Sequence, residues 1–233
     1  MTFTSAGHVW ARRSKNHAKV HRIYGGHGSF GKPVFQEIRG DHLYVITNNT
    51  NSIVRMDLDG AHQEVIGRLP RGWHTFDISP SGKKLIYDAY GKNVNLKAPR
   101  IESLRTGRKG KPLSLSNVDG FDWNPNGKKI EYFLQGPARY GVGLMNGNGT
   151  HAHLVVRGAQ LGTSPTLPQV VGLEWALGGR RLLAAVEDEQ HDGLYLGWIN
   201  PFAAHPHVTS VPGQVLHFRG APLYDMDWAR VGH

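Results

Sequence analysis

The sequence predicts an all-β protein built from one repeated unit, and two observations support this prediction. The first is that segment 76–87 (FDISPSGKKLIY) returns as segment 121–132 (FDWNPNGKKIEY), with looser copies at 36–44, 173–183 and 226–232. The second is that the copies share one pattern, an apolar strand, a tight turn, and a second apolar strand after basic residues. The 30 Gly and 13 Pro among 233 residues are typical of a β protein with many turns.

An acidic residue stands just before the Ile or Trp of each copy and gives the repeat a register. We call these five residues the register acids: Glu37, Asp77, Asp122, Glu174 and Asp227. Units of about 40 to 50 residues are typical of four-stranded propeller blades. We therefore predict a single five-bladed β-propeller domain over residues 1–233. An incomplete six-bladed ring is the alternative.

The remaining strands of each unit follow in order along the chain. Third strands that end in turns, several of them at Asp-Gly or Asn-Gly, are predicted at 53–60, 101–107, 142–149 and 194–201. Fourth strands are predicted at 64–66, 113–115, 153–156 and 208–211. The N-terminal residues supply three further strands, at 1–5, 8–11 and 20–24. The first strand of that unit is predicted at 224–229, so pairing the two chain ends would close the ring and leave no long sheet edge exposed.

The turn motif resembles a known repeat family. Segments 78–85 and 124–130, together with the strand end at 56–60, are similar to TolB-type propeller repeats, which are relatives of WD-repeat proteins. This sequence has Ser81 and Asn126 where that family usually has Asp. The resemblance implies a propeller fold and favours a location outside the cytoplasm, although the chain begins without a signal-peptide pattern. Propellers of this kind serve as binding platforms, peptidase gates and lyases, so the motif leaves the function open.

Charge and composition limit the function classes. A net charge of +9 would suit a nucleic-acid partner, but the basic residues are dispersed, with neither interleaved aromatic residues nor a helix-turn-helix pattern. We therefore do not expect the protein to bind nucleic acid. No run of 18 apolar residues occurs, so we expect no transmembrane segment. The absence of Cys excludes disulfides and thiolate metal sites.

The five register acids are the first candidate site. The first strand of each propeller blade lines the central channel, so the acids should converge there. Because neighbouring carboxylates raise one another's pKa, either a cation compensates their charge or separate hydrogen-bond donors satisfy each acid. A cation held only by oxygen ligands would be Ca²⁺ or a similar hard ion. The structural alternative is that each acid ties its own strand to the loop above.

Loop residues are the second candidate site. His74 lies three residues before Asp77, in a loop that should surround the channel mouth. The predicted ligand-binding residues are His74, Trp73, Arg71, Asn117, Asp119, His217 and Arg219. Ordinary loop polarity is the alternative. The pairs His151/His153 and His205/His207 could each bind a metal, or they could be surface histidines at strand ends.

These observations predict a monomeric binding or scaffold propeller that presents its loops and channel to a protein or small-molecule partner. The alternative is a hydrolase or lyase, glycosidase-like or metal-dependent, that uses the channel carboxylates as acid and base. The two hypotheses differ in one observable property. An enzyme needs at least two register acids in an open pocket with perturbed pKa values, whereas a scaffold would bury and pair them.

Overall fold

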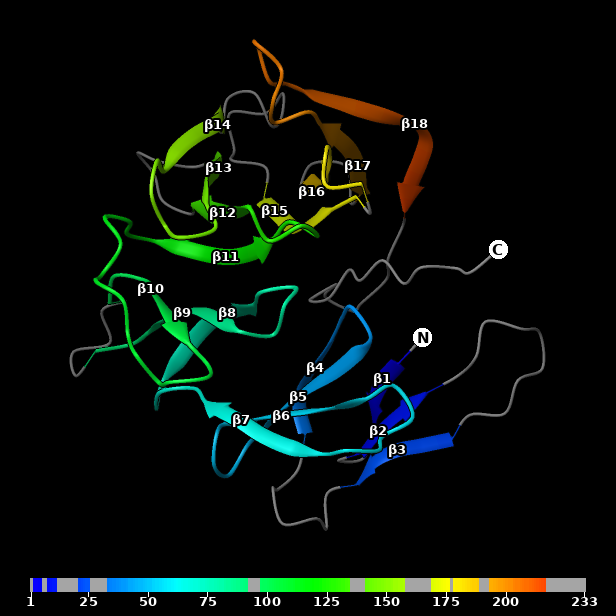
Figure 1. Cartoon of the computed structure of the whole chain (residues 1–233). Helices are drawn as coiled ribbons and strands as arrows, with labels where there is room; N and C mark the ends of the chain where they lie inside the picture. Colours follow the sequence, from blue (N-terminus) through cyan, green and yellow to red (C-terminus); the bar gives the residue numbers. More distant parts are fainter. Residues whose placement is uncertain are drawn as a thin grey trace. The chain divides into compact units, whose positions relative to one another are not determined.

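The computed structural model describes residues 2–5, 8–11, 21–25, 33–91, 97–134, 141–157, 169–176, 178–188 and 193–216. These residues form strands, turns and irregular segments, and no helix that could cross a membrane occurs among them. The strands are arranged in five sheets, and within every sheet they follow one another in chain order (Figure 1). The prediction of an all-β protein is therefore confirmed.

Three of the sheets are four-stranded and antiparallel. The first contains β4 (Pro33–Arg39), β5 (His42–Thr47), β6 (Ser52–Asp57) and β7 (Glu64–Arg68). The second contains β11 (Val118–Trp123), β12 (Lys129–Leu134), β13 (Gly141–Asn146) and β14 (His153–Arg157). The third contains β15 (Gln169–Trp175), β16 (Leu182–Asp188), β17 (Gly193–Ile199) and β18 (Val208–Leu216). In each, a register acid lies in the first strand.

The other two sheets have three strands each. One contains β1 (Thr2–Ser5), β2 (His8–Ala11) and β3 (His21–Gly25), which agrees with the three strands predicted at the N-terminus. The other contains β8 (Trp73–Ile78), β9 (Lys84–Ala89) and β10 (Arg100–Ser103). The strand predicted at 224–229 lies outside the described residues, so the number of blades and the ring closure remain predictions.

The fourth strand predicted at 113–115 is wrong. Residues 108–110 run beside β10 instead, because Gly110 N–H donates to Ile101 O (2.7 Å) and Ser103 N–H donates to Arg108 O (3.0 Å). A single bridge pairs Glu102 with Lys109. The edge of this sheet is thus already occupied when the chain reaches residue 113, which leaves 113–115 available for another contact.

Three of the repeated turns have the same hydrogen bonds. Gly82 N–H donates to Ser79 O (2.7 Å), Gly127 N–H to Asn124 O (2.8 Å), and Gly179 N–H to Ala176 O (2.7 Å). The three glycines have φ angles of 64°, 70° and 62°, a left-handed conformation that glycine adopts without steric cost. The strand–turn–strand prediction from the sequence repeat is therefore confirmed at these positions.

The chain divides into two compact units, and each is described by itself. Unit 1 comprises residues 1–74, 78–112 and 229–233, and unit 2 comprises residues 75–77 and 113–228. A core cluster in unit 1 joins Tyr24 to four buried residues of the β4–β7 sheet: Leu43, Val45, Val54 and Met56. A core cluster in unit 2 joins the β11–β14 and β15–β18 sheets through Phe133, Val142, Leu144, Val156, Trp175, Leu182, Ala184 and Ile199. Sheets that pack face to face in this way are the arrangement expected for propeller blades.

Candidate functional site

Two of the register acids are buried and carry hydrogen bonds to the next sheet in the sequence. Asp77 Oδ2 accepts from the backbone N–H of Trp123 (2.5 Å), and Asp122 Oδ2 accepts from the backbone N–H of Trp175 (3.2 Å). The indole Nε1–H of Trp175 also donates to Asp122 O (3.2 Å). Each acid therefore binds the residue that follows the next register acid. The structural alternative in the sequence prediction was that each acid ties its strand to the loop above it. For these two acids the partner is instead the first strand of the following sheet.

The position of these strands explains the pairing. β11 and β15 are each the edge strand of their sheet, so N–H groups on their free edge have no partner within the sheet. A buried carboxylate likewise needs donors, because removing its charge from water is costly. Asp77 and Asp122 are only 2% and 4% exposed. Pairing the buried acid with the edge amide satisfies both groups with a charge-assisted hydrogen bond.

The other register acids have different surroundings. Glu37 forms an ion pair with Arg39 two residues along β4. Glu174 is partly buried in β15, and Asp227 lies outside the described residues. Within the described part of the chain, no group of three or more His, Asp or Glu side chains is arranged to hold a metal ion. The Ca²⁺ site at Glu37, Asp77, Asp122, Glu174 and Asp227 accordingly stays a prediction.

A sixth acid, Glu131, belongs with this site and was not predicted from the sequence. Glu131 stands opposite Asp122 in the β11–β12 register and is 2% exposed. Its Oε2 has no hydrogen-bond partner among the described residues. Burial, reinforced by the negative charges of Asp122 and Asp77, holds the pKa of Glu131 well above its usual value. The neutral, protonated carboxyl of Glu131 is therefore favoured up to a higher pH than that of an exposed glutamate.

The signal for Glu131 was present in the repeat itself. When segments 76–87 and 121–132 are aligned, Glu131 stands where the first copy has Ile86. The residue opposite the register acid is Tyr44 in the β4–β5 pair and Leu183 in the β15–β16 pair. A carboxyl group at a position that is otherwise aromatic or aliphatic marks an exception to the repeat, and such exceptions are expected at functional or strained sites.

Three of the predicted loop residues lie at the start of β8. His74 Nδ1 is 3.5 Å from Oδ1 of the buried Asp88, and its ring meets the ring of Tyr90 edge-on at 5.3 Å. Asp88 lies in β9, and Tyr90 directly follows that strand. Trp73 is partly buried and Arg71 is exposed. These two contacts of His74 therefore lie on its own side of the chain, with β9 and the residues that follow it.

The remaining loop candidates lie elsewhere. Asn117 and Asp119 are exposed around the start of β11, and Asn117 has a φ of 56°. His217 and Arg219 lie outside the described residues. Because His74 and Asp119 belong to different units, the common ligand-binding rim remains a prediction.

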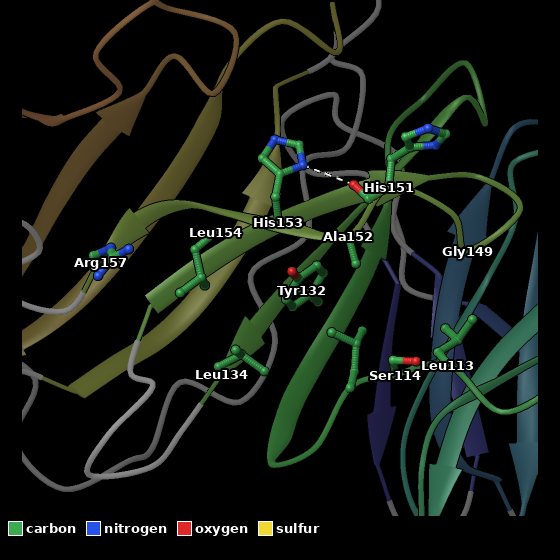
Figure 2. Close-up of a pocket in the computed structure, with 11 residues that line it drawn as sticks. Leu113, Ser114, Tyr132, Leu134, Gly149, His151, Ala152, His153, Leu154 and Arg157 are labelled. Carbon is green, nitrogen blue, oxygen red and sulfur yellow. Dashed lines mark hydrogen bonds between the residues drawn. The ribbon is translucent and has the colours of Figure 1, made fainter.

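A pocket on unit 2 was also not predicted from the sequence (Figure 2). Its volume is about 680 Å³. The lining residues come from the segment before β11, from β12, and from the turn and strand around β14: Leu113, Ser114, Leu115, Tyr132, Leu134, Gly149, His151, Ala152, His153, Leu154 and Arg157. The sequence pattern predicts residues 113–115 as a strand of the preceding sheet, whereas in the structure they line this pocket.

The pocket brings together His151 and His153, one of the two predicted histidine pairs. Both side chains are exposed, and His153 Nδ1 lies 2.9 Å from the backbone carbonyl of His151. Among the described residues no third ligand completes a metal site with them. The pair is better described as part of a pocket rim, at the end where β14 begins (Figure 2).

Comparisons with known proteins support the fold. No family model matches the chain, and no curated protein matches it in sequence. Among solved structures, an oligogalacturonate lyase in complex with manganese is similar with a TM-score of 0.61 and 14% identity, over 88% of this chain and 60% of the lyase. A putative TolB from Agrobacterium tumefaciens has a TM-score of 0.61 and 13% identity, over 90% of this chain and 75% of its own. A nidogen/laminin complex has a TM-score of 0.50 and 13% identity, over 81% and 66%.

At these identities the similarity defines the fold alone. The chain has a TolB-type β-propeller fold, as the turn motif indicated. It spans about 60% of the length of the lyase. The solved structures that share this fold include both binding proteins and an enzyme, so the choice between these functions depends on the site residues themselves.

Proposed function

We propose that this chain is a binding propeller whose register acids have a structural role and take no part in catalysis. The observation that carries the proposal is the pairing of Asp77 and Asp122 with the backbone amides of Trp123 and Trp175. Both carboxylates are almost completely buried, and each has its charge stabilised by a fixed donor. A general base has to reach the proton it removes, directly or through one water molecule. Neither carboxylate meets that requirement.

The similarity to an oligogalacturonate lyase is the main argument for the alternative, an enzyme with catalytic carboxylates. Glu131 has a raised pKa, which is a property of many general acids. It is nevertheless as buried as the two aspartates, and the described pocket is lined by other residues. The burial of these three carboxyl groups therefore favours a binding function over catalysis of hydrolysis or elimination.

The direct test is to offer candidate ligands and to ask whether they are changed. The purified protein is incubated with oligogalacturonate and Mn²⁺, and with a panel of small anionic, neutral and cationic compounds. Compounds that raise the melting temperature Tm should be recovered unchanged by mass spectrometry. The variant Asp122→Asn should have a lower Tm than the exposed control Asp41→Asn.

The opposite result would be a product that forms with the wild-type protein and disappears in Asp122→Asn while the Tm stays the same. That outcome would identify Asp122 as a catalytic residue and overturn the proposal. If no compound in the panel raises the Tm, the proposed partner is a protein and not a small molecule.

A structural Ca²⁺ ion at the register acids remains part of the proposal. A rise in Tm with Ca²⁺ but not Mg²⁺, reduced in Glu174→Gln, would support the ion. An unchanged Tm in millimolar Ca²⁺ would exclude it.

A further inference from the structure

The pocket on unit 2 lies apart from the register acids and is the strongest remaining candidate for a ligand site. We propose that it binds a small anion with an apolar body, such as an aromatic or aliphatic carboxylate. This inference rests on the proposed binding function and adds the location and the chemical class of the ligand. Four features of the pocket support it: an apolar floor, a glycine that makes room for an aromatic ring, a cationic and donor rim, and a suitable volume.

The floor of the pocket is apolar because of the alternation along β12. Phe133 points to one face of the sheet, where it joins the unit 2 core cluster. Tyr132 and Leu134 point to the other face and line the pocket, together with Leu154 of β14. Leu113 and Leu115 contribute from the irregular segment before β11. Figure 2 shows Leu113, Tyr132, Leu134 and Leu154 extending from separate segments of the chain.

Gly143 allows the Tyr132 ring to lie close against the sheet. The two residues are cross-strand partners in β12 and β13, and a Cβ at position 143 would overlap the Tyr132 ring. The glycine therefore keeps the ring low and leaves the space above it to the pocket. Burial raises the pKa of Tyr132 to about 12, so its hydroxyl stays protonated at neutral pH and remains a hydrogen-bond donor.

The charge of the lining favours an anion. Arg157 lines the pocket at the end of β14 and is exposed, and Ser114 adds a hydroxyl group. None of the eleven lining residues is Asp or Glu. A guanidinium group can bind a carboxylate through two parallel hydrogen bonds, which gives both affinity and orientation. The lining is thus complementary to a ligand with one negative group.

A chain of hydrogen bonds fixes the proton on His151. Lys129 Nζ donates to Asn146 Oδ1 (2.8 Å), and because an ammonium group only donates, this contact fixes the orientation of the amide. Asn146 Nδ2 then donates to His151 Nδ1 (2.9 Å). A neutral His151 must consequently carry its proton on Nε2. His151 is one of the lining residues, and this nitrogen is then a donor.

His153 has the opposite tautomer. Its Nδ1 lies 2.9 Å from a carbonyl oxygen, which can only accept, so Nδ1 carries the proton. A neutral His153 therefore presents Nε2 as an acceptor, and a protonated one presents a donor.

The volume of the pocket agrees with a small ligand. Pockets that bind small molecules are commonly about 300 to 1,000 Å³, and this one is about 680 Å³. The apolar floor would provide most of the affinity, and the rim would select the charge. Experiments can therefore measure separately how much the apolar body and the negative group of a ligand contribute to binding.

The experiment uses three probes that share one apolar body: 2-naphthoate, 2-naphthalenemethanol and 2-naphthylmethylammonium. Binding to the full chain is followed by calorimetry and by ¹H–¹⁵N NMR. We expect 2-naphthoate to bind with a Kd on the order of 1 mM or tighter, and about tenfold more tightly than the ammonium compound. The amide shifts should concentrate at residues 113–115 and 149–157.

Two variants and a matched control test the assignment. Arg157→Gln should weaken 2-naphthoate about tenfold and leave 2-naphthalenemethanol unchanged. Ala152→Glu, an exposed position in the lining, should abolish 2-naphthoate binding. Arg180→Gln, an exposed arginine of the same unit outside the pocket, should change neither.

Equal binding of all three probes, no binding at all, or shifts confined to other residues would each overturn the inference. These failures leave the proposed function intact, because that depends on the register acids. Conversely, chemical conversion of 2-naphthoate would contradict the proposed function while leaving the pocket assignment in place.

Discussion

Hairpins 76–87 and 121–132 are two copies of one sequence motif with different surroundings. Both have the same turn, with its glycine at positive φ, and both place a buried aspartate just before the turn. They differ opposite that aspartate, where the first copy has the apolar Ile86 and the second has Glu131. They also differ in the size of the sheet, which has three strands in all where the first hairpin lies and four where the second lies.

The comparison separates what the motif determines from what it leaves free. The turn and the register acid are the same in both copies, because the turn connects the strands and the acid satisfies an edge amide. Unit 2 carries the departures from the repeat, namely Glu131, whose Oε2 has no hydrogen-bond partner among the described residues, and the pocket above Tyr132. We therefore expect a binding site at the positions where the two copies differ, and a structural role at the positions that they share.

Removing the register acids should have the largest effect on stability. Asp77→Ala leaves the buried N–H of Trp123 without its acceptor, and we expect a loss of about 3 kcal/mol in the free energy of unfolding. Asp122→Ala should cost less, about 2 kcal/mol, because its hydrogen bond to the Trp175 N–H is longer. Urea unfolding monitored by tryptophan fluorescence measures both.

The exposed control Asp41→Ala should change the free energy of unfolding by no more than about 0.5 kcal/mol. If Asp77→Ala were equally harmless, the hydrogen bond to Trp123 would not be a structural link between sheets, and the proposed role of the acids would fail. If Asp122→Ala cost more than Asp77→Ala, Glu131 would be interacting favourably with Asp122.

Much of the fold could be predicted from the sequence because the repeat contains its own turn chemistry. Segments 79–82 and 124–127 combine a residue that caps the turn with a glycine at the position that requires positive φ. The strand predicted at 113–115 does not form, because residues 108–110 reach the sheet edge first through backbone hydrogen bonds that carry little sequence signal. The pocket depends on that same displacement and was missed for the same reason.

The candidate site could be predicted only in part. The register acids are visible as a repeated charge, and two of them are buried as a structural role requires. Their partners could not be deduced, because the amides of Trp123 and Trp175 belong to the backbone and any residue would supply them. Glu131 was visible as a break in the alignment, but its surroundings depend on packing that a single sequence does not display.

Replacing Glu131 should stabilise the protein at neutral to alkaline pH. Burial raises the folded-state pKa of Glu131 above the unfolded value of about 4.5, so its stabilising contribution is complete below that pH. The contribution is lost as the pH rises through the folded pKa, since a charge then forms beside Asp122 and Asp77. Glu131→Gln should remove this loss and gain about 1 to 2 kcal/mol at pH 8.

The measurement is the free energy of unfolding between pH 4 and pH 9. The wild-type curve should fall as the pH rises over this range, and the Glu131→Gln curve should fall less steeply. Glu131→Leu, which copies Leu183 at the corresponding place, should resemble Glu131→Gln. Equal slopes for wild type and both variants would mean that Glu131 is ionised and stabilised by a group that lies outside the described residues.

The smallest effect should come from the side chain that begins each turn. Ser79 Oγ accepts from Lys84 N–H and Asn124 Oδ1 accepts from Lys129 N–H, each at 3.0 Å, whereas the third copy has Ala176 at this position. Ser79→Ala and Asn124→Ala should each cost about 1 kcal/mol in the free energy of unfolding. Ala176→Asn should gain part of that amount, because the Arg181 N–H then acquires an acceptor. A gain at position 176 would mean that the hairpins are interchangeable at the turn, so that their differences lie in Glu131 and the pocket. A loss there would show that the third copy has adapted its turn to other contacts.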